Sequence, residues 1–279
     1  MPPELAGPID VLDALATERS AFVELLRSLE EADWKLPTEC PIYDVQGVAT
    51  HILGDDLSLL SRQRDSAPPG LLDVLEDGMD FRTALDRFND RWVEAAGFFS
   101  PPLLVEMLER SGEWTLDWYR AVDSESPGEP VGFFAAAGPS PYWQIAAREY
   151  VERWVHHHQI RRAVGRPDLD TVEILQPALG VVARGLAAHL HDLGAGQGDS
   201  IVLLVGLDAW TLVREGERWE LLEDGVESAT SCLQITRDDA TPAFSKGWSA
   251  PEVEAAFVLE GDLELGRRAA HAIAAFAGR

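Results

Sequence analysis

Residues 149–167 read EYVERWVHHHQIRRAVGRP, and this stretch decides both the local fold and the site. Its pattern predicts a helix that ends at Gly165 and Pro167, because glycine tolerates the left-handed backbone of a helix end and proline cannot continue a helix. Glu152 and His156 are four residues apart, which places both side chains on one helix face with Cβ atoms roughly 5–6 Å apart. A carboxylate and an imidazole at this spacing can bind one cation, as paired ligands do in zinc proteases.

A third ligand must come from elsewhere in the chain, and His51 is the natural candidate. It lies in a second expected helix, which Asp44 can cap and which continues to about Arg64. His51 is flanked there by Val48 and Ile52, so an unpaired polar ring would be costly. Spacing alone leaves two interpretations open: a metal site, or a solvated ion pair beside a hydrogen-bonded core histidine.

The run His156-His157-His158 does not offer three ligands to one ion. Successive helix residues point about 100° apart, because a turn holds roughly 3.6 residues. We therefore expect His157 and His158 to lie on other faces of the helix, or to contact the ligand residues and not the ion itself. Arg161 and Arg162 follow in the last turn, where the helix dipole alone explains positive charge.

Outward from this stretch, residues up to about 165 predict helices separated by proline and glycine. Apolar residues recur at helical spacing in the ranges 8–32, 44–64, 80–93, 100–122 and 141–163. After residue 170 one more helix is expected over 172–193. Short β-type runs then follow at 201–206, 210–214, 219–222 and 232–236, with 253–259 as a further strand and 262–276 as a closing helix. This predicts an α+β chain: a helical bundle over residues 1–168 and a small α+β domain over residues 169–279.

The composition restricts the functions that the chain can serve. Lys and Arg total 23 against 48 Asp and Glu, a formal charge of −25. Nucleic acid and anionic membrane surfaces both require a basic patch, so we expect neither as a partner. No apolar run reaches the roughly 18 residues of a membrane span, and the N-terminus does not read as a secretory signal. We expect a cytoplasmic protein that acts on a small molecule, and two cysteines provide no disulfide framework.

Two stretches together resemble the mycothiol-dependent maleylpyruvate isomerase family. Residues 37–57, PTECPIYDVQGVATHILGDDL, are similar to its first signature, a Pro-Thr turn that leads through an aromatic residue and a valine into a ligand helix. Residues 149–167 are similar to its second signature: Glu, then Trp-Val-His, Ile-Arg and Gly-Arg-Pro. The resemblance implies a DinB-like up-down helical bundle with a small C-terminal α+β domain, and it places the metal ligands on His51, Glu152 and His156.

The chain departs from the family pattern at three positions near these ligands. Tyr43 stands where members usually have tryptophan, Gly47 where an aspartate is common, and Gln159 where an aspartate precedes the Ile-Arg pair. Two carboxylates are therefore missing beside the ligands. Groups of this kind orient ligands and tune the metal, so the changes bear on the substrate.

The resemblance further implies a divalent metal and mycothiol as a thiol cosubstrate. Zinc is the default for His and Glu ligands, although iron, nickel and manganese also accept them. A coordinated thiol is deprotonated, so a metal-bound thiolate would serve as the nucleophile without a protein cysteine. If the thiolate added to a cis double bond and then left again, the enzyme would be an isomerase. If the thiolate stayed attached to an electrophilic substrate, the enzyme would be an S-transferase.

An anionic, carboxylate-bearing substrate needs cationic anchors, and Arg82, Arg148 and Arg214 are the candidates. The plain alternative for each is a solvated surface arginine. Two other functions stay open: a thiol-independent metallohydrolase that uses metal-bound water, and a non-enzymatic protein that binds an apolar ligand. Tryptophans that could line an apolar pocket occur at spacings equally typical of core residues, at Trp92, Trp114, Trp118, Trp143 and Trp154.

Overall fold

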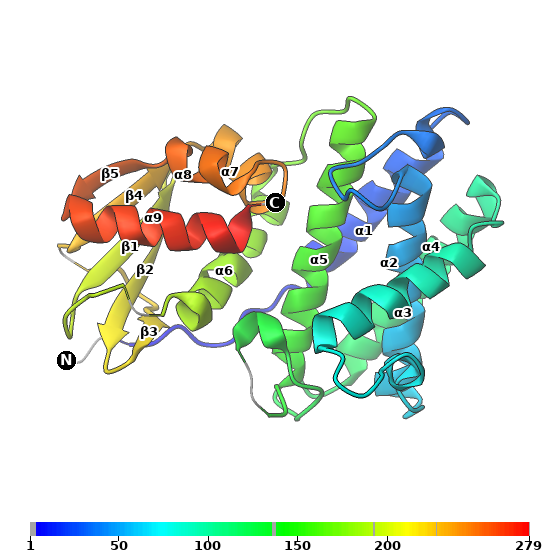
Figure 1. The fold of residues 1–279 in the computed structure, drawn as a ribbon, viewed down its shortest axis with the longest axis horizontal. Helices are drawn as coiled ribbons and strands as arrows, with labels where there is room; N and C mark the ends of the chain where they lie inside the picture. Colours follow the sequence, from blue (N-terminus) through cyan, green and yellow to red (C-terminus); the bar gives the residue numbers. More distant parts are fainter. Residues whose placement is uncertain (1–3, 136–137, 192, 227, 279) are drawn as a thin grey trace.

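The computed structural model describes residues 4–135, 138–191, 193–226 and 228–278, arranged as a helical half and a half built around a sheet (Figure 1). The predicted α+β class is confirmed. The helices of the first half are α1 (Leu12–Arg27), α2 (Val45–Leu59), α3 (Phe81–Ala95), α4 (Pro101–Ala121) and α5 (Tyr142–Ala163). Asp44 caps α2 as expected, accepting a hydrogen bond from the Gly47 amide at 2.7 Å. A π-helical turn continues α2 to Arg64.

The second half contains a five-stranded sheet in the order β3-β2-β1-β4-β5. Its strands are β1 (Ser200–Val205), β2 (Asp208–Glu215), β3 (Arg218–Leu221), β4 (Ser231–Ile235) and β5 (Val258–Gly261). Its helices are α6 (Val172–His189), α7 (Arg237–Phe244), α8 (Ala250–Ala256) and α9 (Leu263–Ala277). Strands β1 and β4 are parallel, and the other neighbouring pairs are antiparallel.

One face of the sheet is buried. Successive side chains of a strand point to opposite sides, so buried residues alternate with more exposed ones along β1. In β1, Ile201, Leu203 and Val205 are at most 2% exposed, whereas Val202 and Leu204 are partly exposed. Helix α6 packs on β2 and β3, and α9 packs on β4 and β5. Helix α6 also contacts α1 and α5, so it lies between the sheet and the bundle (Figure 1).

The expected strand over residues 253–259 is wrong for most of its length. Residues 250–256 form α8, and the strand begins only at Val258. The cause is a capping box: the Glu252 carboxylate accepts a hydrogen bond from the Ser249 amide at 2.7 Å, which starts a helix. Pro251, in the first turn, needs no amide donor there. The local capping signal overrides the apolar composition.

The N-terminal segment lies with the sheet rather than with the bundle. The Ala6 amide donates to the Leu221 carbonyl at 2.8 Å, and the Glu223 amide donates to the Glu4 carbonyl at 2.9 Å. Residues 4–6 thus pair at the β3 edge of the sheet. The domain boundary between residues 168 and 169, in the connection from α5 to α6, stays a prediction.

A buried network of charges joins α1, α2, α4 and α5 at the centre of the bundle. The Asp56 carboxylate is fully buried and accepts hydrogen bonds from Arg19 at 2.9 Å, from the Ser111 hydroxyl at 2.6 Å and from Arg153. Arg153 also donates to Glu149 at 2.5 Å. Burial alone would raise the pKa of Asp56, but the charges of the two arginines hold it below its usual value. The network fixes α1, α2, α4 and α5 to one another.

Among the described residues, no helix is both long and apolar enough to cross a membrane.

Replacing Asp56 with alanine tests the network. The change leaves Arg19 and Arg153 as buried charges without their shared partner, so we expect the free energy of unfolding in urea to fall by about 3–5 kcal/mol near neutral pH. The pKa of Asp56 is lowered in the folded state, so its contribution is present above the usual aspartate pKa and is lost as pH falls toward the folded value. The difference between wild type and variant should therefore shrink below about pH 4.

Asp65→Ala is the matched control, because that carboxylate is exposed and pairs only with its neighbour Arg64. Its free energy of unfolding should equal that of the wild type. Equal unfolding curves for Asp56→Ala and Asp65→Ala would show that the network does not stabilise the fold.

Candidate metal site between α2 and α5

Helices α2 and α5 pack side by side and bring the three predicted ligands together. His51 lies on α2, and Glu152 and His156 lie on α5. One ligand atom from each can be chosen so that all three lie within 4.8 Å of one another. The Glu152 Oε1 atom lies 3.3 Å from His156 Nε2 and 3.8 Å from His51 Nε2. Residues about 100 positions apart in the sequence thus converge on one point.

The spacing of these atoms fits a small divalent cation. Ligands about 2.0–2.1 Å from a tetrahedral zinc ion lie roughly 3.3–3.4 Å from one another. The two distances from Glu152 match that spacing or exceed it by a few tenths of an ångström, and all three atoms lie within 4.8 Å. Both histidine side chains are about nine-tenths buried, while Glu152 is 31% exposed. The donor set therefore has one accessible side, where a further ligand can approach.

Gln159 fixes which nitrogen of His156 faces the other ligands. Its side-chain oxygen lies 2.8 Å from His156 Nδ1, and an amide oxygen only accepts hydrogen bonds. His156 Nδ1 therefore carries the proton, and the lone pair of Nε2 points toward Glu152 and His51. The amide thus orients the ring without adding negative charge.

Two further charged residues belong to the site, and sequence reasoning missed one of them. Asp55 lies one helical turn beyond His51, with its Oδ2 3.6 Å from His51 Nε2. Its four-residue separation from His51 repeats that of Glu152 and His156, and this was the available signal. Arg148, a predicted candidate, lies 3.4 Å from Glu152 Oε2 and also pairs with Glu149 at 2.7 Å.

These charges set the electrostatics of the site. Burial opposes the ionised form of Glu152, but Arg148 and both histidines hold its pKa well below the usual value. Burial alone would lower the pKa of His51, yet the nearby carboxylates of Asp55 and Glu152 raise it. Negative charge next to a buried imidazole favours an added cation.

Residues 43 and 47 are neighbours beside His51. The Tyr43 ring stacks on His51, with centroids 6.0 Å apart and an interplanar angle of 28°. Its hydroxyl donates to Asp90 at 2.8 Å. A Cβ atom at Gly47 would lie 3.0 Å from the Tyr43 Cβ, tighter than ordinary contacts. A side chain at residue 47 would therefore crowd residue 43.

The other two histidines of the run point elsewhere, as expected. His157 Nδ1 lies 3.0 Å from Glu18, between α5 and α1. His158 donates from Nδ1 to the Trp154 carbonyl at 2.7 Å and accepts at Nε2 from the Leu169 amide at 3.1 Å. Burial lowers the pKa of His158 to about 3, so this ring is neutral.

The structure separates the three predicted arginines. Arg148 belongs to the site, whereas Arg82 is 84% exposed and pairs with Asp86 at 3.3 Å. Arg214 lies on β2, and α6 lies between that part of the sheet and the bundle; its Nη1 atom is buried without a hydrogen-bond partner. Arg214 is therefore not brought to the ligands.

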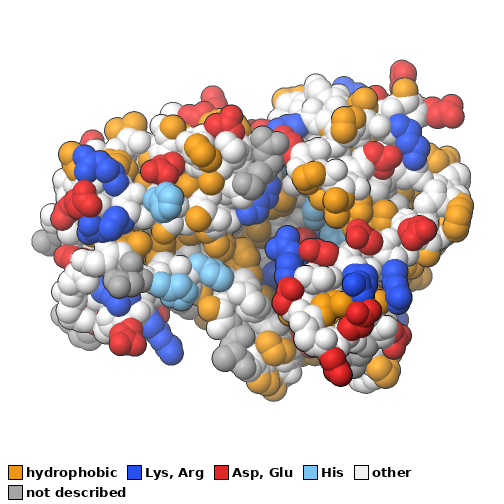
Figure 2. Space-filling model, in the orientation of Figure 1, with side chains coloured by type: hydrophobic (Ala, Val, Ile, Leu, Met, Phe, Trp, Pro, Cys, Tyr) orange, Lys and Arg blue, Asp and Glu red, His pale blue; other side chains and the backbone are white. Residues whose placement is uncertain are grey.

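Lys246, in the sheet half, was missed by the sequence analysis. Burial lowers the pKa of its ammonium group, while the charge of Glu152 opposes that effect and Arg82 adds to it. Its ammonium group donates to the Phe276 carbonyl at 2.7 Å and to the Gly278 carbonyl at 2.9 Å. Figure 2 shows a hollow between these halves, with histidine surface inside it and Lys or Arg side chains on both sides.

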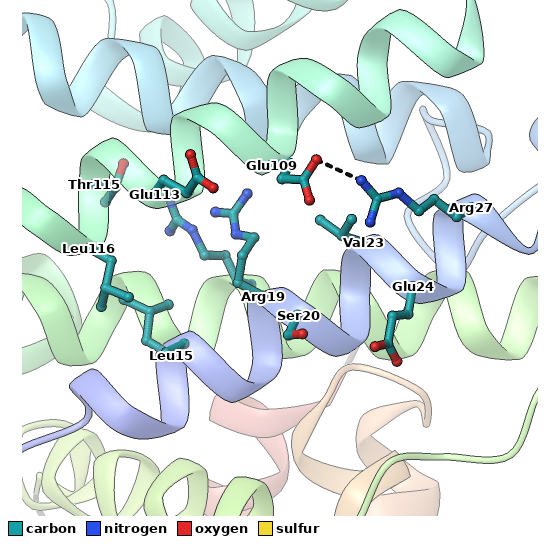
Figure 3. Close-up of a pocket in the computed structure, with 13 residues that line it drawn as sticks. Leu15, Arg19, Ser20, Val23, Glu24, Arg27, Glu109, Glu113, Thr115 and Leu116 are labelled. Carbon is teal, nitrogen blue, oxygen red and sulfur yellow. Dashed lines mark hydrogen bonds and ion pairs between the residues drawn. The ribbon is translucent and has the colours of Figure 1, made fainter.

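A separate pocket of about 250 Å³ opens between α1 and α4 (Figure 3). Its lining includes Arg19 and Arg153 of the buried network, and an ion pair between Arg27 and Glu109 spans its rim at 2.6 Å. None of the three ligands lines it. The pocket is therefore distinct from the candidate metal site.

Comparisons with known proteins agree on one family. The model described as the mycothiol maleylpyruvate isomerase N-terminal domain matches residues 15–161. The chain is similar to a crystal structure of the mycothiol-dependent maleylpyruvate isomerase, with 12% identity, a TM-score of 0.54, and 85% of this chain and 87% of that chain covered. A histidine-to-alanine mutant of that isomerase gives a TM-score of 0.53 at the same identity and coverage. At this identity the structures show a shared fold. No curated protein matches the chain.

Metal analysis of protein purified without a histidine tag tests the ligand set. We expect about one equivalent of a divalent metal, because the three donors form one open site. His51→Ala, Glu152→Ala and His156→Ala should each lose it. His271→Ala is the control, because this histidine is exposed and pairs with Glu254, so that its loss should leave the metal content unchanged. Full metal content in all three ligand variants would exclude this site.

Gln159→Ala tests the orientation of His156. Without the acceptor at Nδ1 the ring is free to turn, and we expect metal affinity to fall about 10- to 100-fold, measured by competition with a chelator. Gln159→Glu retains an acceptor and should recover most of the affinity. An affinity unchanged in Gln159→Ala would show that this hydrogen bond does not orient the ligand.

Proposed function

This chain belongs to the mycothiol maleylpyruvate isomerase family, whose N-terminal domain model matches residues 15–161, and on that premise we propose that it is a metal-dependent isomerase that uses mycothiol as a thiol cosubstrate. The observation that carries the proposal is the convergence of His51, Glu152 and His156 within 4.8 Å. The site is part of the matched region, and its donor types are those that zinc prefers.

The proposed metal is held by those three side chains. When bound, a divalent cation would supply the positive charge that stabilises the deprotonated form of a thiol near neutral pH. The protein's own residues prepare the site for this. Gln159 holds the Nδ1 proton of His156, and Arg148 holds one oxygen of Glu152, leaving the other directed at the histidines.

The covering of the site limits the access of bulk water to the two ligand histidines. The Tyr43 ring closes one side of His51, and the hydrogen bond from its hydroxyl to Asp90 fixes the ring. Both ligand histidines are about nine-tenths buried. The open side therefore lies at Glu152, the most exposed of the three ligands.

The charge distribution favours a small substrate that carries a carboxylate. The whole chain has a formal charge of −25, which repels anions at long range. Near Glu152, however, Arg148 supplies a positive group, which also pairs with Glu149. This local cation can attract a carboxylate against the background charge.

Calorimetric titration with mycothiol, followed by an isomerase assay, tests the proposal. Metal-loaded protein should bind mycothiol, and chelated protein should lose at least about tenfold in affinity, because the thiol needs the cation to ionise. With maleylpyruvate as the probe substrate, the absorbance should change to that of the trans isomer only when metal and mycothiol are both present. His156→Ala should abolish that change, and His271→Ala should not.

The alternatives have their own outcomes in the same experiment. A stable thiol–substrate adduct identified by mass spectrometry would mean S-transfer instead of isomerisation. Hydrolysis of substrate without mycothiol would favour a metallohydrolase. Protein that takes up no metal and does not bind mycothiol, but does bind an apolar ligand, would contradict the enzymatic proposal.

A further inference from the structure

Arg162, in the last turn of α5, is bonded to two segments far away in the sequence. Its Nε donates to both carboxylate oxygens of Glu39, at 2.7 and 2.9 Å. Its Nη1 donates to the Ser245 hydroxyl at 2.9 Å and to Asp168 at 3.2 Å, and its Nη2 donates to the Ser245 carbonyl at 3.1 Å. The helix dipole does not require any of these contacts, so the charge at this position has a further role.

The first segment is the covering loop, residues 37–44. The Thr38 hydroxyl donates to the Tyr43 carbonyl at 2.8 Å and accepts from the Cys40 amide at 3.1 Å. A β-bridge joins the two ends of the loop. Internally bonded in this way, the loop is a compact unit, and Glu39 is the side chain that anchors it to α5.

The second segment is the turn that follows α7, residues 245–247, here called the C-terminal turn because it belongs to the C-terminal half of the chain. Ser245 is fully buried, and Lys246 has the left-handed φ of 61°, which non-glycine residues seldom adopt. A Cβ atom at Gly247 would lie 3.0 Å from the Arg162 Cζ, so the turn packs directly against the guanidinium group. Arg162 therefore also supports the backbone that presents Lys246.

The covering loop borders the ligand set, because the Tyr43 ring stacks on His51. The turn belongs to the other half of the chain, where the Lys246 ammonium group donates to the Phe276 and Gly278 carbonyls at 2.7 and 2.9 Å. A single guanidinium group thus joins the loop over His51 to the sheet half.

We propose that Arg162 is a positioning residue that ties the covering loop to the C-terminal turn and thereby holds the loop at the entrance of the His51–Glu152–His156 site. Loss of the guanidinium group frees the loop and the turn to move apart. The inference rests on the proposed function in placing a reaction at this site. The thiol-labelling readout below does not depend on that function.

The experiment compares the labelling rates of the two cysteines with a maleimide, resolved by peptide mass spectrometry. Cys40 reports on the covering loop, and Cys232, on β4, is the internal reference. Labelling tracks the open population of a segment, so Arg162→Gln and Glu39→Gln should each raise the Cys40 rate about tenfold or more, with Cys232 unchanged. Arg161→Gln is the control, because it removes the same charge from the same turn.

The kinetic readout separates positioning from general instability. Arg162→Gln should raise the KM for mycothiol more than it lowers kcat, because the entrance loosens while the ligands stay in place. Arg162→Lys, which keeps the charge but not the paired donors, should fall between wild type and Arg162→Gln. Thermal melting shows whether each variant is folded at the assay temperature.

An unchanged Cys40 rate in the folded Arg162→Gln and Glu39→Gln variants would overturn the proposal, and so would an equal increase in Arg161→Gln. Should Arg162→Gln not fold, Glu39→Gln decides alone, because it breaks only the loop contact. A faster Cys40 rate in protein that shows no activity with mycothiol would leave Arg162 in its positioning role and remove the proposed function.

Discussion

A buried ion pair fastens α2 to α5 beside the residues that form the candidate site. Asp56 and Arg153 make that pair, and each lies within five residues of a ligand on its own helix. Because the pair is shared with Arg19 and Glu149, the relative position of the two helices depends on four charges that compensate one another in the interior. Without this constraint the distance between His51 on α2 and the Glu152–His156 pair on α5 would not be fixed.

The ligands could be predicted from the sequence because their signal is local. Glu152 and His156 share a helix face whatever the tertiary fold. His51 was the natural third candidate in an apolar stretch of a second helix, and the resemblance to a known signature then supported it. The contacts of Asp55 and Gln159 could not be predicted in the same way, because each depends on which side chain of the folded chain lies next to it. Asp55 alone left a usable pattern, its four-residue separation from His51.

Two expectations failed for reasons that composition does not reveal. Residues 253–259 are apolar enough for a strand, but the hydrogen bond between Ser249 and Glu252 starts a helix first. Arg161 bonds locally, donating to the Pro167 carbonyl at 2.6 Å, whereas Arg162 lies between two distant segments that only the folded chain brings together. In both cases a specific hydrogen bond, and not a propensity, determines the outcome.

The structure of the metal-loaded protein, with the cation located by its anomalous scattering, tests the central claim most directly. The account predicts one cation bonded to His51 Nε2, His156 Nε2 and a Glu152 oxygen at about 2.0–2.2 Å. A cation bound at other residues, or these three side chains paired with one another in metal-loaded protein, would contradict it.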